Sequence, residues 1–437
     1  MGKAAVVYVI GLSLIIGIGL ANINESSVGS MDTYSTYFGR TMAHNIALAA
    51  ANLGTHRILF NTGSSSAFNG TFNGGTYRVS FADTGTAGNF TKFMTAEALY
   101  NAGGDEIRDT VQAVFRRVTF ARYAWFTEAE VNGYVRPNGK NGPYFGHNDW
   151  KITGDSVWGY AHTNYKFNLA GRPYFHNKVT ATNAATLMDF KGEKDPIYNE
   201  GYEWGVTIQR DTANIGILRS FANQGSPFAP YMANNDVGLE FFADGTARLE
   251  VPCGTGALVD TVVPMSQLTS SGVIGVYGGD LHIKGTYSGQ YTVAAFTGTG
   301  ATGLKGNVWI DGDVLANDSP RGNPLSKDML GIVAERMGYI TKDPTRTLSS
   351  VLYIDAAIYA HNGEFTAEDF WILPKSGRVS VFGSLVQKSA GSLGVFTMAG
   401  LQNGMYYSIR HDPRFLNLGP PKYPFSTKYR LVAWWEG

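Results

Sequence analysis

The chain is short of cysteine and of charge, and each shortage excludes something. Cys253 is its only cysteine, so no disulfide can form within the chain. Charged residues make up only 16% of the 437, and 35 Lys and Arg balance 35 Asp and Glu. Proteins that bind nucleic acid usually carry a basic patch or stripe. The composition therefore predicts no nucleic-acid partner.

Proline and long apolar runs are also scarce, and their positions are informative. The first proline is Pro137, and the one long apolar run covers residues 4–21, with no charge and Ser13 as its only small hydroxyl. About 18 residues at ~1.5 Å each span roughly 27 Å, close to the hydrocarbon thickness of a bilayer. We expect this run to lie in lipid, to be removed as a signal peptide, or to pack against copies of itself.

A second apolar pattern follows without a break. Its residues are spaced by three or four, as on one face of an amphipathic helix, and Gly54 is positioned to end the helix. The sequence therefore predicts one helix over residues 1–56, apolar over 4–21 and amphipathic over 22–54. A signal peptide has no reason to share a helix with the protein that follows it, although a signal peptide or a plain membrane anchor stays an alternative. The amphipathic stripe consists of Met31, Tyr34, Phe38, Met42, Ile46, Ala49 and Leu53.

Large apolar side chains occupy most of the first half of the predicted helix. Leaving them in water would cost on the order of 20 kcal/mol, at ~1.5–3 kcal/mol each. Gly11, Gly17 and Gly19 interrupt them and would allow close helix approach or local unwinding. We expect the following side chains to contact lipid or neighbouring helices: Val6, Val7, Val9, Ile10, Leu12, Leu14, Ile15, Ile16, Ile18 and Leu20.

The rest of the chain has the composition of an all-β body. It is rich in glycine and aromatic residues, with 54 Gly, 24 Tyr and 25 Phe, and its short alternating runs are separated by turns at the spacing of an all-β chain. A sandwich or a β-solenoid fits, and similar corners in AHTN, GDV and AHNG favour the solenoid. We predict a β-rich connecting region over 57–149, a solenoid-like body over 150–194 and 271–425, a sandwich-like β insertion over 195–270, and a C-terminal tail over 426–437.

Motifs for catalysis or cofactor binding are weak. Gly298, Gly300 and Gly303 match the GxGxxG dinucleotide pattern as a string, but the residues that follow read as a strand rather than the required helix, which predicts a turn. Neither HExxH nor GxSxG occurs. We therefore predict no enzyme activity, no catalytic residue, no cofactor and no metal. An alternative stays open on fold grounds, because β-solenoids can host glycan lyases or hydrolases, and these need paired acids. Its candidate acids are Asp355, Glu364, Glu368 and Asp369.

Several motifs, taken together, indicate a resemblance to a known family. Residues 153–180 contain TGDSVWGYAHTN and GRPYFHNKVT, residues 307–341 contain NVWIDGDVL and DMLGIVAERMGYIT, and residues 353–424 contain YIDAAIYAHNGEF, VSVFGSLVQ and YYSIRHDPRFLNLGPPKYP. Together they resemble a bacterial family of surface proteins with a type IV pilin-like or pilus-assembly-like N-terminus and a long β-rich domain. The resemblance covers most of 115–425 and implies export through the inner membrane, retention by the N-terminal helix and a β-solenoid ectodomain.

The N-terminus is similar to mature pilins in its apolar start, its long helix and its glycines, and it departs from them at one position. Pilins usually have a glutamate at the fifth mature residue, whereas here Ala5 is fifth and Glu25 is the first acid. Register in a helix bundle would then come from packing alone.

These observations lead to two function hypotheses beside the lyase or hydrolase. In the first, the chain is a structural subunit of an extracellular pilus-like filament. It is held in the inner membrane, handled by pilus-type secretion machinery, and polymerised with copies of itself through the N-terminal helix. In the second, it is a surface protein that is anchored in the membrane by residues 4–21, does not polymerise, and binds a partner or a polysaccharide through its β-solenoid.

Overall fold

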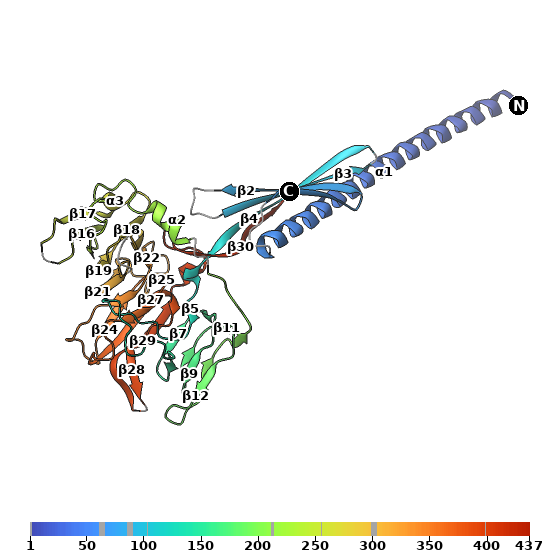
Figure 1. The fold of residues 1–437 in the computed structure, drawn as a ribbon. Helices are drawn as coiled ribbons and strands as arrows, with labels where there is room; N and C mark the ends of the chain where they lie inside the picture. Colours follow the sequence, from blue (N-terminus) through green and yellow to red (C-terminus); the bar gives the residue numbers. More distant parts are fainter. Residues whose placement is uncertain are drawn as a thin grey trace. The chain divides into compact units, whose positions relative to one another are not determined.

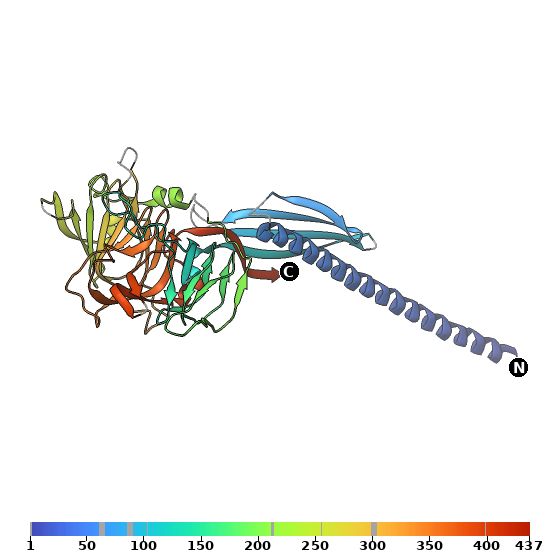
Figure 2. The same cartoon turned by 60° about the horizontal axis from the view of Figure 1, so that its bottom comes forward.

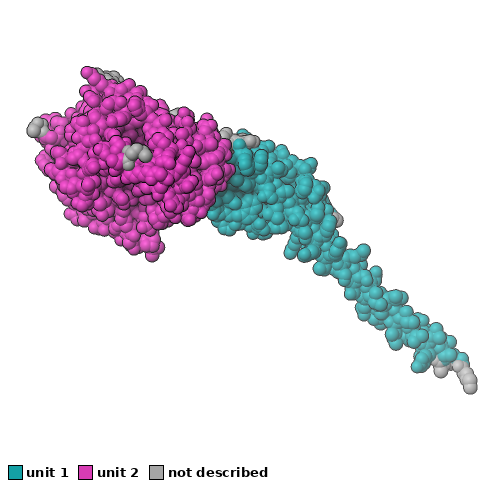
Figure 3. Space-filling model, turned by 90° about the horizontal axis from the view of Figure 1, so that it is seen from below, with its two compact units in different colours: residues 1–117, 427–437 teal, residues 118–426 magenta. Residues whose placement is uncertain are grey.

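The computed structural model describes residues 2–60, 66–84, 91–102, 104–210, 214–254, 256–298, 304–397 and 399–437. Within them the chain is mainly β with one long N-terminal helix, as predicted (Figure 1). It forms two compact units, residues 1–117 with 427–437 and residues 118–426 (Figure 3). We call them the helix unit and the ladder unit. The boundary after Arg117 falls inside the predicted connecting region 57–149, which is therefore divided between the two units.

The N-terminal helix, α1, runs over Gly2–Phe60 and is 59 residues long. It continues past the predicted end at residue 56, and Gly54 does not stop it. A Cβ atom at Gly54 would lie 2.4 Å from Met94 Sδ and 3.0 Å from Val79 Cγ1. This glycine therefore serves close packing against strands and not helix termination.

Five strands form the sheet of the helix unit in the order β1-β2-β3-β4-β30. The first four are β1 (Phe68–Phe72), β2 (Gly75–Thr84), β3 (Thr91–Ala102) and β4 (Asp105–Thr119), and they pair antiparallel. Alternate residues of β3, among them Met94, Ala96 and Ala98, are buried in one core with the C-terminal half of α1. Figure 2 shows these strands lying along that half of the helix and not along its N-terminal half.

The predicted C-terminal tail is instead a strand, β30 (Phe425–Glu436), which pairs with β4. Tyr429 is buried in the core of the helix unit, and Trp435 stacks on Phe93 with ring centroids 6.3 Å apart. The N–H of Gly437 donates a hydrogen bond to the carbonyl of Thr110 at 2.9 Å. Residues 426–437 were predicted as a tail because their partner strand lies more than three hundred positions earlier in the chain, beyond any local pattern.

Parallel strands build the ladder unit, and they follow two series. The first series is β18-β20-β22-β25-β27-β5-β8-β11-β14. Ile332 pairs with Ile358, Ile358 with Leu385, and Leu385 with Trp125, so that one buried apolar row crosses the stack. The strands are β18 (Val273–Tyr277), β20 (Gln290–Phe296), β22 (Met329–Ala334), β25 (Ala357–Ala360), β27 (Lys375–Ser389), β5 (Trp125–Ala129), β8 (Ala161–Thr163), β11 (Val179–Ala181) and β14 (Tyr202–Trp204).

The second series runs beside it and shares β27. Ile354 pairs with Val381, Val381 with Ile409, and Ile409 with Val157, again as a buried apolar row. Its other strands are β15 (Val237–Phe241), β19 (Leu281–Tyr287), β21 (Val308–Ala316), β23 (Gly338–Ile340), β24 (Val351–Ile354), β26 (Phe365–Ala367), β29 (Gly400–His411), β7 (Ser156–Trp158), β10 (Tyr174–Phe175) and β13 (Ile197–Tyr198).

The remaining elements are short. Strands β16 (Thr246–Val251), β17 (Val259–Pro264) and β28 (Gly394–Thr397) add antiparallel pairs, and β6 (Lys151–Ile152), β9 (Asn168–Ala170) and β12 (Thr186–Met188) form a small parallel sheet. The helices are α2 (Asn214–Phe221), α3 (Met265–Leu268), η1 (Phe120–Arg122) and η2 (Pro413–Leu416).

The predicted insertion over 195–270 has a different role in the structure. Its first strands, β13 and β14, extend the two series at one end, while β15 pairs with β19 at the other. The segment therefore connects the two ends of the stack, and only β16 and β17 stand outside the parallel pairing. The hairpin turn predicted at ADGTA, residues 243–247, is confirmed, since β15 and β16 pair antiparallel across it.

The parallel pairing does not amount to the predicted β-solenoid. Along the first series, Trp125 pairs with Ala161 and Ala161 with Val179, so the step along the chain differs from one pair of strands to the next. Among the residues that the structure describes, no closed solenoid is detected. We therefore name the unit by its ladders.

Candidate functional site in the N-terminal helix

The surroundings of α1 change at Gly39. Up to Phe38 the helix is almost entirely exposed, whereas from Gly39 onward one face is buried against the sheet of its own unit. That buried face consists of Gly39, Ala43, Ile46, Ala47, Ala50, Ala51, Gly54 and Ile58. The helix is therefore fixed to the body by its second half and leaves its first half uncovered.

Small residues bring the helix close to the sheet. A Cβ atom at Gly39 would lie 2.4 Å from Ile107 Cδ1 and 2.7 Å from Ala102 Cβ. Polar contacts add to this packing, because His44 Nδ1 lies 2.7 Å from Asp109 Oδ2 on β4 and His44 Nε2 lies 3.6 Å from Glu436 Oε2 on β30. The C-terminal strand thus helps to hold the helix in place.

The predicted amphipathic stripe is not the face that packs on the sheet. Ile46 is its only buried large member, Met42 is half-buried, and the other large side chains are exposed. Large apolar residues at helical spacing mark an adjacent face of α1, whereas the face that contacts the sheet consists mostly of alanine and glycine. The missed signal is the recurrence of alanine and glycine at helical spacing in AHNIALAAANLG, residues 43–54. The exposed members of the stripe are Met31 at 74%, Tyr34 at 70%, Phe38 at 45% and Leu53 at 50%.

All the side chains predicted to contact lipid or neighbouring helices are exposed, with exposed fractions between 53% and 71%. They are Val6, Val7, Val9, Ile10, Leu12, Leu14, Ile15, Ile16, Ile18 and Leu20. The helix is long and apolar enough to cross a membrane, with a mean hydropathy of 2.3 in its best window. A Cβ atom at Gly11, Gly17, Gly19 or Gly29 would meet nothing within 4 Å.

The exposed apolar surface reaches further than one bilayer can cover. Residues 4–24 carry no charge and, at ~1.5 Å each, already span about 30 Å, the thickness of the hydrocarbon core. Beyond Glu25, the side chain of Val28 is 51% exposed. Those of Met31, Tyr34 and Tyr37 are each at least 70% exposed. A helix lying in lipid up to Asn24 would therefore still leave large apolar side chains in water.

The acids of the lyase or hydrolase alternative have different neighbours. Asp355 accepts a hydrogen bond from Arg321 Nε at 2.7 Å, and Glu364 accepts one from the N–H of Gly133 at 2.5 Å. Burial raises the pKa of both carboxyl groups. Glu368 accepts from the N–H of Lys342 at 3.1 Å, and the N–H of Asp369 donates to the Tyr134 hydroxyl at 3.2 Å. The carboxyl groups of Asp355, Glu364 and Glu368 thus each accept a hydrogen bond, whereas the contact of Asp369 is made by its backbone.

Other predicted features are placed only in part. Gly298 is described, whereas Gly300 and Gly303 of the GTGATG string lie outside the described residues. Over the described ranges, no group of three or more His, Cys, Asp or Glu side chains could hold a metal ion.

Comparison with known proteins gives a structural likeness at low sequence identity. No protein-family model matches the chain, and no curated protein matches it. Among solved structures it is similar to the competence-associated pilin ComZ from Thermus thermophilus, with 12% sequence identity and a TM-score of 0.36 over 91% of this chain and 98% of that one. A likeness at this level leaves the function to be argued from the helix itself.

Proposed function

We propose that this chain is a structural subunit of a pilus-like extracellular filament. In this proposal the first half of α1 is held in the inner membrane, is handed over by pilus-type secretion machinery, and then packs against the same segment of other copies. The β-rich units stay in water, and the role is structural rather than enzymatic.

The first support is the cost of exposing the helix. The predicted apolar side chains from Val6 to Leu20 are all more than half exposed, and at ~1.5–3 kcal/mol each they would cost on the order of 20 kcal/mol in water. Lipid removes this cost as well as a helix bundle does, so assembly from the membrane must gain its free energy from packing and from contacts between bodies. The open surroundings of Gly11, Gly17 and Gly19 leave space for a close helix neighbour.

The observation that carries the proposal is the apolar surface beyond the reach of lipid. Residues 5–38, about 34 in number at ~1.5 Å each, form roughly 50 Å of uncovered helix, against ~30 Å of hydrocarbon. A plain anchor leaves Val28, Met31, Tyr34 and Tyr37 wet, whereas a second copy of the same helix can cover them. A head-to-tail contact that does not close on itself produces a helical filament.

Electron microscopy of sheared cell-surface material tests the proposal. We expect filaments that contain this chain, and we expect the double variant Met31→Ser/Tyr34→Ser to stay in the membrane without forming them. The control Leu325→Ser changes a side chain that is 84% exposed in the ladder unit and should leave the filaments intact. Recovery of the wild type only from detergent-solubilised membranes would favour the non-polymerising anchor. Normal filaments from the double variant would show that sister helices do not cover these residues.

A further inference from the structure

The ladder unit contains a cavity of about 740 Å³ whose lining comes mostly from two distant parts of the chain. One part lies within residues 132–155, and the other lies within residues 392–407, which include β28 and the first half of β29. Ala170, Met188, Phe190 and Phe370 complete the lining. The pairing of Ile409 on β29 with Val157 on β7 brings these parts together. Cavities of this size are typical of sites for small organic ligands.

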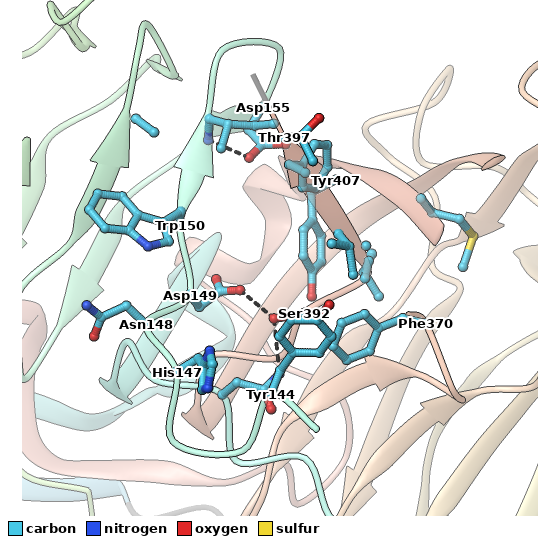
Figure 4. Close-up of a pocket in the computed structure, with 18 of the residues that line it drawn as sticks. Tyr144, His147, Asn148, Asp149, Trp150, Asp155, Phe370, Ser392, Thr397 and Tyr407 are labelled. Carbon is cyan, nitrogen blue, oxygen red and sulfur yellow. Dashed lines mark hydrogen bonds between the residues drawn. The ribbon is translucent and has the colours of Figure 1, made fainter. Parts of the chain in front are cut away.

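Buried acids form one side of the cavity. Asp149 and Asp155 are its acidic lining residues over the part of the chain that the structure describes, and they are 8% and 6% exposed. His147 also lines it. Ser392 Oγ donates a hydrogen bond to Asp149 Oδ1 at 2.8 Å, and the N–H of Ile152 donates to Asp155 Oδ2 at 2.9 Å. Figure 4 shows Asp149 and Ser392 turned toward each other.

Negative charge exceeds positive charge behind this side of the cavity. Lys151 is 2% exposed, donates to Asp149 Oδ2 at 2.5 Å, and has its Nζ 3.6 Å from Glu130 Oε2. Three carboxyl groups, Glu130, Asp149 and Asp155, therefore share one buried ammonium group. Glu130 Oε2 is buried without a hydrogen-bond partner. Burial is the main reason that the pKa of Asp155 is raised to about 6, and Asp149 raises it further. An additional cation would stabilise the ionised acids.

Aromatic rings form the apolar part of the cavity lining. Tyr144, Trp150, Phe370 and Phe396 all line the cavity, and the Tyr144 and Phe370 ring centroids are 5.7 Å apart. In Figure 4 the Trp150 ring lies apart from the Tyr144 and Phe370 rings, with Asp149 labelled between them. The faces of such rings attract cations and cover the C–H surface of a ligand. An anionic ligand would lie against the carboxylates of Asp149 and Asp155, which carry like charge.

We propose that this cavity binds a small organic ligand that carries a protonated amine. The ammonium group lies against Asp149 and Asp155, and the body of the ligand lies against the aromatic rings. Two sources present this chemistry, an amino sugar and a free alkyl diamine. The proposal is independent of filament assembly, because every residue in it belongs to the ladder unit.

Calorimetric titration of the full chain in mild detergent tests the proposal with three probes, glucosamine, cadaverine and glucose. We expect at least one of the two amines to bind ten or more times more tightly than glucose, which has the ring and no charge. Tighter binding of glucosamine identifies the amino sugar as the source, and tighter binding of cadaverine identifies the diamine. Absence of measurable binding by both amines at millimolar concentration, or equal affinity for glucosamine and glucose without cadaverine binding, would overturn the proposal.

Two variants and one control locate the site. Asp155→Asn should weaken amine binding about tenfold, and Phe396→Ala, which removes a wall and no charge, should weaken it while the near-ultraviolet circular dichroism of the ladder unit stays that of the wild type. The control Asp244→Asn changes an acid in the turn between β15 and β16, where it accepts hydrogen bonds from Thr246, and it should leave affinity unchanged. Unchanged affinity in both cavity variants would overturn the assignment of the cavity.

Discussion

The packing of α1 on its own sheet gives a sharp prediction about two positions of the same helix. Ile46 is fully buried and Leu53 is 50% exposed, although both belong to one pattern of large apolar residues. Truncating a buried isoleucine to alanine typically costs 2–5 kcal/mol, because both transfer energy and a cavity contribute. Ile46→Ala should therefore destabilise the helix unit by about 3 kcal/mol, and Leu53→Ala by about 1 kcal/mol or less.

Hydrogen exchange of the full chain in mild detergent, followed by mass spectrometry, measures the difference. Amides in residues 43–58 and in β3 exchange through opening of the helix unit, and about 3 kcal/mol corresponds to roughly a hundredfold faster exchange. The ladder unit serves as an internal reference in both variants. Equal acceleration by Ile46→Ala and Leu53→Ala would refute the assignment of the buried face to the alanine and glycine side of the helix.

Three further predictions concern the buried charges and the exposed glycines. Lys151→Met should destabilise the ladder unit by about 3–5 kcal/mol in urea unfolding, because it leaves Glu130 and Asp149 buried without their cation; a loss below about 1 kcal/mol would contradict this. Burial raises the pKa of Asp155 from its usual 3.8 to about 6 in the folded protein, so the stability contributed by this group is present below about pH 4 and is lost as pH rises through 6. Asp155→Asn should therefore gain stability relative to the wild type between pH 4 and pH 7, and a constant difference in urea unfolding would count against this. Gly17→Leu should leave helicity and membrane extraction unchanged, since a Cβ atom there would meet nothing within 4 Å beyond the adjacent helix backbone, but it should reduce filament yield if sister helices pack there.

Part of the fold follows from local patterns in the sequence. The apolar run over residues 4–21 and the helical spacing after it predict the long helix, because both patterns can be recognised within a few helical turns. The alternation in TYRVSFA predicts a strand, and β2 pairs with β3 over those residues. These features depend on neighbours a few positions away, which a single sequence displays directly.

Other parts depend on pairings that no local pattern displays. The contact of Leu385 with Trp125 and that of β30 with β4 join segments hundreds of residues apart. The buried face of α1 was missed because alanine and glycine carry little hydrophobic signal, although they decide how closely the sheet can approach. The cavity was missed because its walls also depend on distant pairings. Asp149 and Ser392 are brought together by the pairing of β29 with β7 and of β27 with β5.

The central claim is that copies of this chain cover one another along the exposed part of α1, and photo-cross-linking tests it most directly. A photoreactive phenylalanine analogue at Tyr34, which is 70% exposed and lies beyond the charge-free run, can be irradiated on intact cells. We expect covalent multimers that contain two or more copies of this chain, linked through residues 2–38. Irradiated material that contains only single copies, recovered with the membrane, would contradict the account.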